Sequence, residues 1–359
     1  MLKRESTAAK NVRDSNIELL RILVTLFVII LHYNNKNNGK AFVYAEALPE
    51  QYQILVILEM AAICAVNIFV LISGYFMCNS RKADITKVLR LYLDVMLLPA
   101  AYYLLNCVLK HASVSLPQLL RTMIPLCWYV AVYSGLYLIS PYLNRIVRDL
   151  PKAQFRTMLL VFLTVCSIWP SALELITALT GTKLTSACPL GTQGSGAGYT
   201  LIHFIMMYLL GSYFRLHPPE VKKRIRIPAV CLYGICTVLL VLYSKLYWAG
   251  SLSYCNPLAI LQAIALFHAF QSFQLKNRWI NEISGCSFGV YLLHTKFFRF
   301  FPIQNQVTGS PWMIPLHVGW TAVRIYVISA VFYWIYQNTL GRILNKMLKN
   351  LKFMQYQVS

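Results

Sequence analysis

Charged residues are scarce in this 359-residue chain: Asp, Glu, Lys and Arg together fill only 13% of the positions. An average soluble domain carries about twice that share. The scarcity excludes a soluble protein, which would need a charged surface around its core. Acidic residues are rarest, numbering 12 against 33 Lys and Arg, so the formal net charge is +21.

Several sequence motifs are also missing. None of the ten cysteines forms a CxxC pair, and most lie inside apolar stretches, so neither a disulfide framework nor a metal site is predicted. A phosphate-cradling glycine-rich loop and a nucleophilic serine elbow are absent as well.

The sequence shows no repeat and no long linker. We therefore expect one integral domain over 1–359, with a cytoplasmic segment at 1–15 and a basic cytoplasmic tail at 339–359.

Long apolar runs, in contrast, are frequent. Apolar residues make up 58% of the chain, and stretches long enough to cross a hydrocarbon core of about 30 Å recur along it. Backbone groups in lipid must be satisfied within the segment, which predicts helices. The expected fold class is therefore an all-α polytopic membrane protein of about ten transmembrane helices. The ten candidate spans are 17–34, 53–77, 88–109, 124–142, 157–178, 199–214, 227–248, 253–273, 282–301 and 312–338.

The basic residues predict the orientation of these spans. Clusters such as "SRKADITKVLR" and "RIVRDLPKAQFR" fall on one side, whereas the other side carries only isolated cations such as Lys36 and Lys40. By the positive-inside rule, both termini are expected in the cytoplasm. The positive charge then reflects topology and attraction to anionic membrane lipids. It does not indicate nucleic-acid binding, because no nucleic-acid module separates the clusters.

The first span carries ionisable groups in the stretch "NIELLRILVTLFVIILHYN" (16–34). Eleven residues of helix advance about 1,100°, so Arg21 and His32 share a face about 16 Å apart along the axis. Ionisable groups in a span usually face a bundle interior or a wet cavity. A polar path along this face is one interpretation. A juxtamembrane ion pair of Glu18 with Arg21, and an interfacial His32, is the other.

This stretch resembles the first helix of the acyltransferase-3 family, integral membrane O-acyltransferases marked by an arginine and a histidine separated by ten residues. Further resemblances follow in the order of the family. They are "NIFVLISGYF" (67–76), "CWYVAVYSGLYLISPYL" (127–143), "MMYLLGSYF" (206–214) and "ISGCSFGVYLLH" (283–294). One departure is Lys87-Val-Leu-Arg90, where the family often has Arg-x-x-Arg. This change keeps the charge and puts the role of Lys87 in doubt.

The resemblance implies transfer of an acyl group, usually acetyl, from cytosolic acyl-CoA to a hydroxyl of a cell-surface or exopolysaccharide sugar. It implies no metal, and it places the protein in the plasma (inner) membrane of a bacterial cell. An acyl group such as succinyl, and a lipid-linked or a polymeric carbohydrate acceptor, are all compatible with the sequence. The number of copies in the assembly is left open.

Roles for individual residues follow from this resemblance together with their charge and their depth in the spans, where Glu59 lies at a depth comparable to that of His32. His32 is the expected general base, although an acyl-histidine intermediate is equally compatible. Glu59 is the candidate to orient its imidazole. The candidates for holding the donor are Arg21, Lys82, Lys87, Arg90, Ser73, Tyr75 and Arg324, and those for the acceptor are Trp128, Tyr129 and His294.

Other interpretations remain open at this stage. Glu59 also fits a buried polar pair without chemistry, and Arg324 fits a structural partner of Glu59 or Glu174. Trp128 and Tyr129 also fit an interfacial aromatic belt. For the whole chain, the rivals are a transporter or flippase of an anionic substrate, and a sensing or uptake module built on the same fold without transferase activity.

Overall fold

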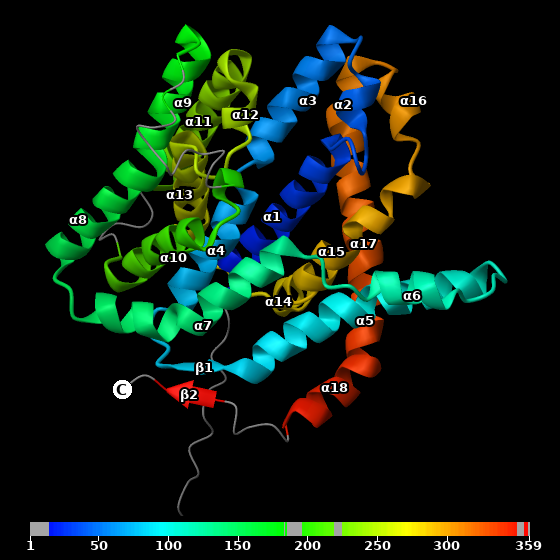
Figure 1. The fold of residues 1–359 in the computed structure, drawn as a ribbon. Helices are drawn as coiled ribbons and strands as arrows, with labels where there is room; N and C mark the ends of the chain where they lie inside the picture. Colours follow the sequence, from blue (N-terminus) through cyan, green and yellow to red (C-terminus); the bar gives the residue numbers. More distant parts are fainter. Residues whose placement is uncertain (1–13, 183, 185–195, 219–224, 350–354, 358–359) are drawn as a thin grey trace, which may run out of the picture.

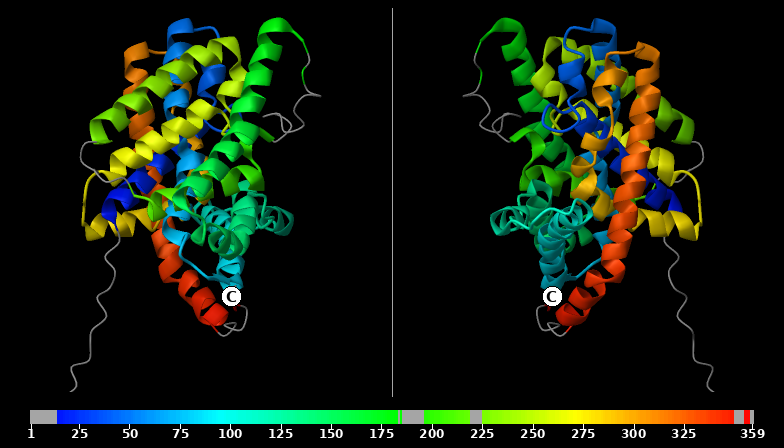
Figure 2. Two further views of the ribbon diagram at one scale, coloured as in Figure 1. Left: turned by 90° about the vertical axis from the view of Figure 1, so that its left-hand side faces the viewer. Right: turned by 90° about the vertical axis from the view of Figure 1, so that its right-hand side faces the viewer.

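The computed structural model describes residues 14–182, 184, 196–218, 225–349 and 355–357, and helices dominate them (Figure 1). We call the end that carries α18 and β2 the lower end and the end that carries α2 and α16 the upper end; Figure 2 shows the same two ends from the sides. The predicted cytoplasmic segment 1–15 lies largely outside the described residues.

Long helices alternate with short ones along the chain. Those in the first half are α1 (Ser15–Asn34), α2 (Ala41–Tyr44), α3 (Pro49–Ala62), α4 (Ala65–Met77), α5 (Ile85–Leu109), α6 (Leu116–Thr122), α7 (Trp128–Arg148), α8 (Lys152–Leu163) and α9 (Trp169–Thr180). The π-helical turn η1 (Thr164–Ile168) joins α8 to α9, and the 3-10 turn η3 (Gly196–Gly198) precedes the second half.

The second half contains α10 (Leu201–Leu216), α11 (Arg226–Leu246), α12 (Trp248–Ser251), α13 (Pro257–Gln271), α14 (Arg278–Ser284), α15 (Ser287–Leu293), α16 (Ile303–Val307), α17 (Ile314–Asn338) and α18 (Leu340–Lys349). Three 3-10 turns lie among these helices: η5 (His294–Lys296), η6 (Phe298–Phe300) and η7 (Pro311–Met313). Two short strands, β1 (Lys82–Asp84) and β2 (Gln355–Gln357), pair antiparallel with Lys82 opposite Gln357.

Local sequence signals fix many of these helix ends. Proline occupies the first turn of α3, where its missing N–H costs nothing. The side chain of Asp84 accepts a hydrogen bond from the backbone of Thr86 and caps α5. Asn256 and Asn277 cap α13 and α14 in the same way. Gly181 ends α9 in the left-handed conformation that glycine adopts without strain.

Six helical stretches are long and apolar enough to cross a membrane: Ser15–Asn34, Pro49–Met77, Ile85–Leu109, Lys152–Thr180, Arg226–Leu246 and Pro311–Asn338. Two shorter apolar helices, Leu201–Leu216 and Pro257–Gln271, coincide with two further predicted spans. The expectation of a helical membrane protein with several spans is therefore confirmed. The structure does not establish the number ten or the sidedness of the termini.

The predicted spans 124–142 and 282–301 differ from the rest. The first corresponds to α7, which runs across the lower part of the bundle in Figure 1 rather than along α17. The second is broken into α14, α15, η5 and η6, with Gly285 and Cys286 between the first two helices. Broken helices at membrane depth are tolerated where protein or a wet cavity surrounds them, and Gly285 does line two cavities.

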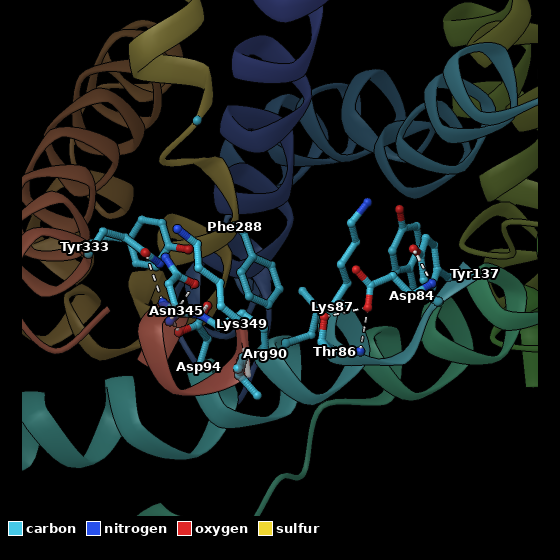
Figure 3. Close-up of a pocket in the computed structure, with 15 residues that line it drawn as sticks. Asp84, Thr86, Lys87, Arg90, Asp94, Tyr137, Phe288, Tyr333, Asn345 and Lys349 are labelled. Carbon is cyan, nitrogen blue, oxygen red and sulfur yellow. Dashed lines mark hydrogen bonds and ion pairs between the residues drawn. The ribbon is translucent and has the colours of Figure 1, made fainter. Parts of the chain in front are cut away.

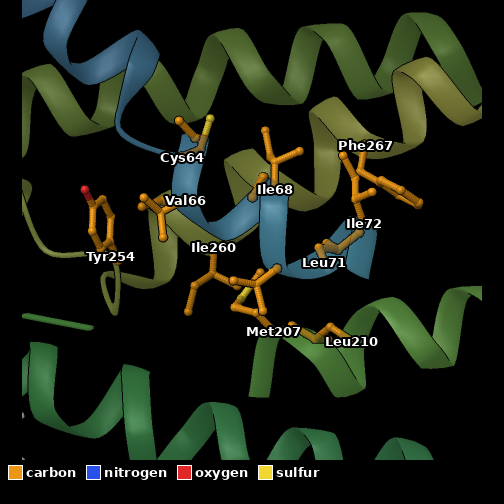
Figure 4. Packing of buried hydrophobic residues seen from close by; sticks show 14 of the residues in the cluster. Cys64, Val66, Ile68, Leu71, Ile72, Met207, Leu210, Tyr254, Ile260 and Phe267 are labelled. Atoms are coloured by element: carbon orange, nitrogen blue, oxygen red, sulfur yellow. The ribbon is translucent and has the colours of Figure 1, made fainter. Parts of the chain in front are cut away.

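Helix α1 lies between two apolar clusters. Ile17, Leu20 and Val24 pack into one cluster together with α4, α10 and α13, part of which is shown in Figure 4. Ile29 and Tyr33 pack into the other cluster with α15 and α17. Since α1 is held on both sides, the side chains on its remaining face have fixed positions.

Two glycines bring α4 and α10 together at very short range. A Cβ atom on Gly74 would overlap the backbone of Tyr208, and one on Gly211 would overlap the carbonyl of Leu71. Small residues at such crossings let helix backbones approach in membranes. Gly74 and Gly211 therefore permit the close packing of α4 on α10.

We expect Gly74→Ala to destabilise the protein by about 1–3 kcal/mol, because the added methyl group overpacks the α4–α10 contact. Thermal unfolding of the protein in nanodiscs would measure the change. The matched control is Gly234→Ala on α11, where a Cβ atom meets nothing within 4 Å. Because alanine is the better helix former, this control should unfold at the same temperature as the wild type or above it. Equal losses from both variants would contradict the packing argument.

Candidate active site

Arg21 is fixed at the lower part of α1 by a carboxylate. Its Nη1 lies 2.7 Å from Oε2 of Glu18, and the same oxygen accepts a hydrogen bond of 2.5 Å from Oγ of Ser284 on α14. The Glu18 side chain is 5% exposed and that of Arg21 28% exposed. The ion pair considered in the sequence analysis therefore exists. It lies inside the bundle rather than at its surface, and it ties α1 to the broken segment.

Arg21 forms part of the wall of a cavity of about 390 Å³, which we call the inner cavity. Arg21 and Val28 contribute from α1, Ser73 from α4, and Tyr129 from α7. The remaining lining residues are Val66, Phe69, Leu91, Val130, Tyr133, Ser284, Gly285, Ser287, Phe288 and Tyr291. Of the two residues predicted to share a polar face of α1, Arg21 thus borders a cavity, whereas His32 is not among the lining residues.

His32 meets a second histidine one turn above this cavity. The rings of His32 and His294 lie edge to face with their centroids 4.6 Å apart. Nδ1 of His32 lies 2.8 Å from the carbonyl oxygen of Val28, a lining residue, and Nδ1 of His294 lies 2.7 Å from that of Tyr291, another one. A carbonyl oxygen only accepts hydrogen bonds, so both Nδ1 atoms carry the proton and both Nε2 atoms keep a lone pair.

His294 has an unusual environment. The side chain is buried, and among the described residues its Nε2 atom has no hydrogen-bond partner. A buried acceptor without a partner is costly unless something donates to it. Of two such imidazoles just above a cavity, one can receive the proton of a hydroxyl group and the other can accept a hydrogen bond from a second hydroxyl. We predicted His294 from the sequence as an acceptor-binding residue, and the structure places it beside His32.

A second cavity, of about 890 Å³, opens at the lower end, and we call it the lower cavity. It shares Leu91, Tyr133, Gly285 and Phe288 with the inner cavity, so the two adjoin. Figure 3 shows Lys87 from α5 and Lys349 from α18 on the two sides of Phe288. The other lining residues are Asp84, Thr86, Arg90, Asp94, Tyr137, Tyr333, Gln337, Asn345 and Leu348.

Arg90 serves a different purpose from the one we predicted. Its guanidinium contacts Asp94 at 3.0 Å, the carbonyl oxygen of Gly341 at 2.9 Å and Oε1 of Gln337 at 2.9 Å. Asn345 contributes a fourth contact at 3.2 Å. These partners occupy the donors of the guanidinium. Arg90 therefore joins α5 to α17 and α18, and Lys87 and Lys349 are the available cations at this cavity.

Glu59 does not contact the imidazole that it was expected to orient. Its Oε2 accepts a hydrogen bond of 2.8 Å from Nδ2 of Asn34, two residues beyond His32. The carbonyl of Val28 orients His32 instead. The alternative of a buried polar pair describes Glu59 better, because helix geometry places Asn34 and not His32 opposite α3.

Tyr75 and Lys82 lie away from both cavities. The hydroxyl of Tyr75 accepts a hydrogen bond of 3.2 Å from Arg215, on a different side of α4 from Ser73. Lys82 is exposed on β1. We therefore assign neither residue to the donor site. Ser73 does line the inner cavity, and its hydroxyl donates to the carbonyl of Phe69 at 2.9 Å.

The two aromatic residues that begin α7, Trp128 and Tyr129, have different surroundings. Tyr129 lines the inner cavity and contacts the ring of Tyr291 at a centroid distance of 5.4 Å. Trp128 packs on Tyr199 at 4.2 Å and on Tyr254 at 6.3 Å, inside the protein. Of the two rings, only Tyr129 reaches the cavity, whereas Trp128 is half-buried among other aromatic rings.

Arg324 lies over two aromatic rings, 4.7 Å from the centroid of Phe301 and 5.5 Å from that of Trp320. Among the described residues it forms no ion pair with Glu59 or Glu174, and it lines neither the inner nor the lower cavity. Cation–π contacts of this kind hold a guanidinium in an apolar setting. We therefore do not place Arg324 at the donor.

Several lining residues were missed by sequence reasoning. Ser284 and Phe288 reach the cavities because the ninth segment breaks at Gly285, and Lys349 does so because α18 folds back under α5. The glycine in "ISGCSFG" was the only available signal for the break. In the described part of the chain, no group of three or more His, Cys, Asp or Glu could hold a metal ion.

Comparison with known proteins gives one family. The family model described as an acyltransferase domain, acyltransferase-3, matches residues 14–341. Neither a curated protein nor a solved structure matches the chain. The matched range begins just before α1 and ends at the start of α18, so it contains nearly all the residues of both cavities.

Proposed function

The chain belongs to the acyltransferase-3 family and is therefore a membrane acyltransferase, and on this premise we propose that it transfers an acetyl group from cytosolic acetyl-CoA to a hydroxyl of a cell-surface or exopolysaccharide sugar. The observation that supports this proposal is a pair of adjoining cavities. They lead from lysines at the lower end to Val28 and Tyr291, whose carbonyl oxygens contact the imidazoles of His32 and His294.

The lower cavity suits the phosphate-bearing end of acyl-CoA. Lys87 and Lys349 line it without an ion-pair partner among the described residues, and ammonium groups bind phosphates as point charges. The lower end also receives the basic clusters of the chain, which under the positive-inside rule face the cytoplasm. The donor thus enters from the compartment that contains it.

The inner cavity suits the acyl end of the donor. Arg21 and Ser73 lie along its wall, and the cavity ends near Val28 and Tyr291, the two residues that hold the histidines. The rise from Arg21 to His32 is about 16 Å, a length that the flexible arm of coenzyme A spans. The thioester would then reach the imidazole pair while the phosphates stay near the lysines.

The transfer needs one base and one leaving group. Nε2 of His32 takes the proton of the sugar hydroxyl as its oxygen attacks the thioester carbonyl carbon. The tetrahedral intermediate collapses, the C–S bond breaks, and the proton on His32 passes to the departing thiolate. Atoms and charges balance, since a hydroxyl and a thioester become an ester and a thiol. Nε2 of His294 accepts a hydrogen bond from a second hydroxyl of the sugar and so positions the attacking one beside His32.

We expect Lys87→Gln to raise the KM for acetyl-CoA about 3–10-fold with little change in kcat, because the lysine binds a remote part of the donor equally in ground and transition states. The assay follows the labelled acetyl group from acetyl-CoA to an oligosaccharide with the protein in nanodiscs. Arg81→Gln, which replaces an exposed cation that lines neither cavity, is the matched control.

Two results would overturn the proposal. One is movement of a carbohydrate across the membrane without consumption of acetyl-CoA, which would favour a transporter. The other is an equal rise in KM for the Arg81 and Lys87 variants, which would show that general surface charge and not the lower cavity attracts the donor.

A further inference from the structure

A third hollow, of about 640 Å³, lies at the upper end, away from the lower cavity, and we call it the outer hollow. The loop after α1 forms one wall, and the segment from η5 to α16 forms the other. Its cations are Lys40, Lys296 and Arg299. Its amides and hydroxyls come from Asn37, Asn38, Tyr44, Tyr102, Thr295, Gln304 and Asn305. None of its described lining residues is acidic.

The outer hollow adjoins the histidine pair through both walls. The backbone N–H of Gly39, a lining residue, donates to the carbonyl of His32 at 2.9 Å. On the other wall, Thr295 directly follows His294. The ring of Phe298 lines the hollow and meets the rings of His294 and Tyr33 edge to face, each at 6.4 Å between centroids. A molecule in this hollow is therefore separated from the histidine pair by the ring of Phe298 on one wall and by the backbone of Gly39 on the other.

The cations of the hollow are not used for ion pairs within the described residues. Arg299 donates to the hydroxyl of Tyr102 at 3.0 Å and to Oδ1 of Asn106 at 3.2 Å, and both partners are neutral. The described ion pairs all lie elsewhere. Neutral partners fix the guanidinium and leave its charge uncompensated, a state suited to a carboxylate or phosphate.

The position of these cations is also unexpected for a membrane protein. Lys and Arg are depleted at the ends of spans that face away from the cytoplasm, and in the orientation proposed above this hollow faces away. The nearest acidic residues along the chain, Glu46 and Glu50, do not line it. Topology therefore gives no reason for the gathering of three cations here, whereas binding of an anion does.

We propose that the outer hollow binds an anionic part of the acceptor, so that the enzyme prefers a glycan with a carboxylate or a phosphate next to the acylated sugar. Lys40, Lys296 and Arg299 hold the negative charge. The amides hydrogen-bond sugar hydroxyls, and Phe298 separates the bound anion from the imidazole pair. This inference rests on the proposed transfer to carbohydrate and deepens it by stating the chemistry of the acceptor.

The test measures equilibrium binding by the full chain in nanodiscs without acetyl-CoA, using microscale thermophoresis. The probes are an oligogalacturonate, a poly(glycerol phosphate) of similar length and the carboxyl-reduced oligogalacturonate as the neutral match. At least one charged probe should bind about 10-fold more tightly than the neutral one, and its affinity should fall with added salt. The two charged probes distinguish a uronic acid from a phosphate as the source of charge.

The variants locate the effect. The double variant Lys40→Gln/Lys296→Gln should lose the preference for charge while its affinity for the neutral probe stays unchanged. Lys36→Gln is the matched control, since it removes an exposed cation of the same loop that does not line the hollow. Equal affinity for charged and neutral probes, or an equal loss in the control, would overturn the inference.

A parallel turnover assay separates this inference from the proposed function. If acetyl-CoA is consumed but a charged acceptor is not preferred, only the inference of an anionic acceptor is overturned. If charged probes bind preferentially but no His32-dependent consumption of acetyl-CoA is found, the proposed transfer reaction is overturned. The outer hollow is then a glycan-binding site only.

Discussion

Replacing His32 with glutamine should lower the kcat of acyl transfer by about 10²–10⁴-fold, the range in which a positioned general base contributes. Glutamine fills a similar volume, and its amide can still donate to the carbonyl of Val28, which His32 Nδ1 contacts at 2.8 Å. It offers no basic nitrogen to the hydroxyl. The measurement is single-turnover transfer of labelled acetyl, and the residual activity should lose the acid limb of its pH–rate profile.

Two companion variants make this result specific. His268→Gln changes a partly buried imidazole on α13 that lines neither cavity and pairs with Gln271, so it should keep normal turnover. His294→Gln should lower kcat less than His32→Gln, because we place His294 as a positioning residue. The assignment of His32 as the base fails if His32→Gln retains turnover, and loss of turnover in the His294 variant alone would assign the base to His294. Affinity for acetyl-CoA should stay near the wild-type value in all three variants.

Replacing Arg21 with alanine should have two effects that can be separated. It removes the guanidinium from the wall of the inner cavity, so kcat/KM for acetyl-CoA should fall about 10-fold, because a group that holds the arm of the donor, at a point away from the reacting atoms, is lost. It also leaves the carboxylate of Glu18, 5% exposed, without its cation. Breaking a buried ion pair on one side costs about 3–5 kcal/mol, so the unfolding temperature should fall as well.

The double variant Glu18→Gln/Arg21→Ala distinguishes stability from function. With the carboxylate replaced by a neutral amide, no unpaired charge stays buried, and the amide oxygen can still accept the hydrogen bond from Ser284 that the carboxylate accepts. The double variant should therefore regain most of the thermal stability and none of the activity. Recovery of turnover together with stability would show that Arg21 has only a structural role.

The resemblance in the sequence and the helix periodicity of α1 predicted part of the site. Both pointed to Arg21 and His32 on one face. Arg21 lines the inner cavity, and His32 contacts the carbonyl oxygen of Val28, which lines it as well. The periodicity is a local property of one helix, so it can be read from the sequence without knowing which helices pack beside it. The polar stripe on α1 was also sufficient to indicate that the face meets a cavity or the bundle interior rather than lipid.

Partners from other helices were harder to predict. Glu59 was placed beside His32 by depth alone, but depth does not determine which side of α3 faces α1, and the carboxylate instead meets Asn34. Arg90 was assigned to the donor by charge alone, and the packing of α18 under α5 surrounds it with acceptors. Charge and depth in a sequence do not show how many hydrogen-bond partners a side chain finds.

The amino-acid sequence by itself determined that this protein is embedded in a membrane as helices and that one helix presents an arginine and a histidine in line. Hydropathy and helical period are properties of short segments, so a linear pattern contains them. Only the tertiary structure decided that the ring of His294 packs against that of His32 and that the helix of the ninth segment is interrupted at Gly285. It also decided that three cations surround the outer hollow. Those features arise where segments far apart along the chain come into contact. The stability of such a contact depends on how the side chains of both segments pack together, which neither segment encodes alone.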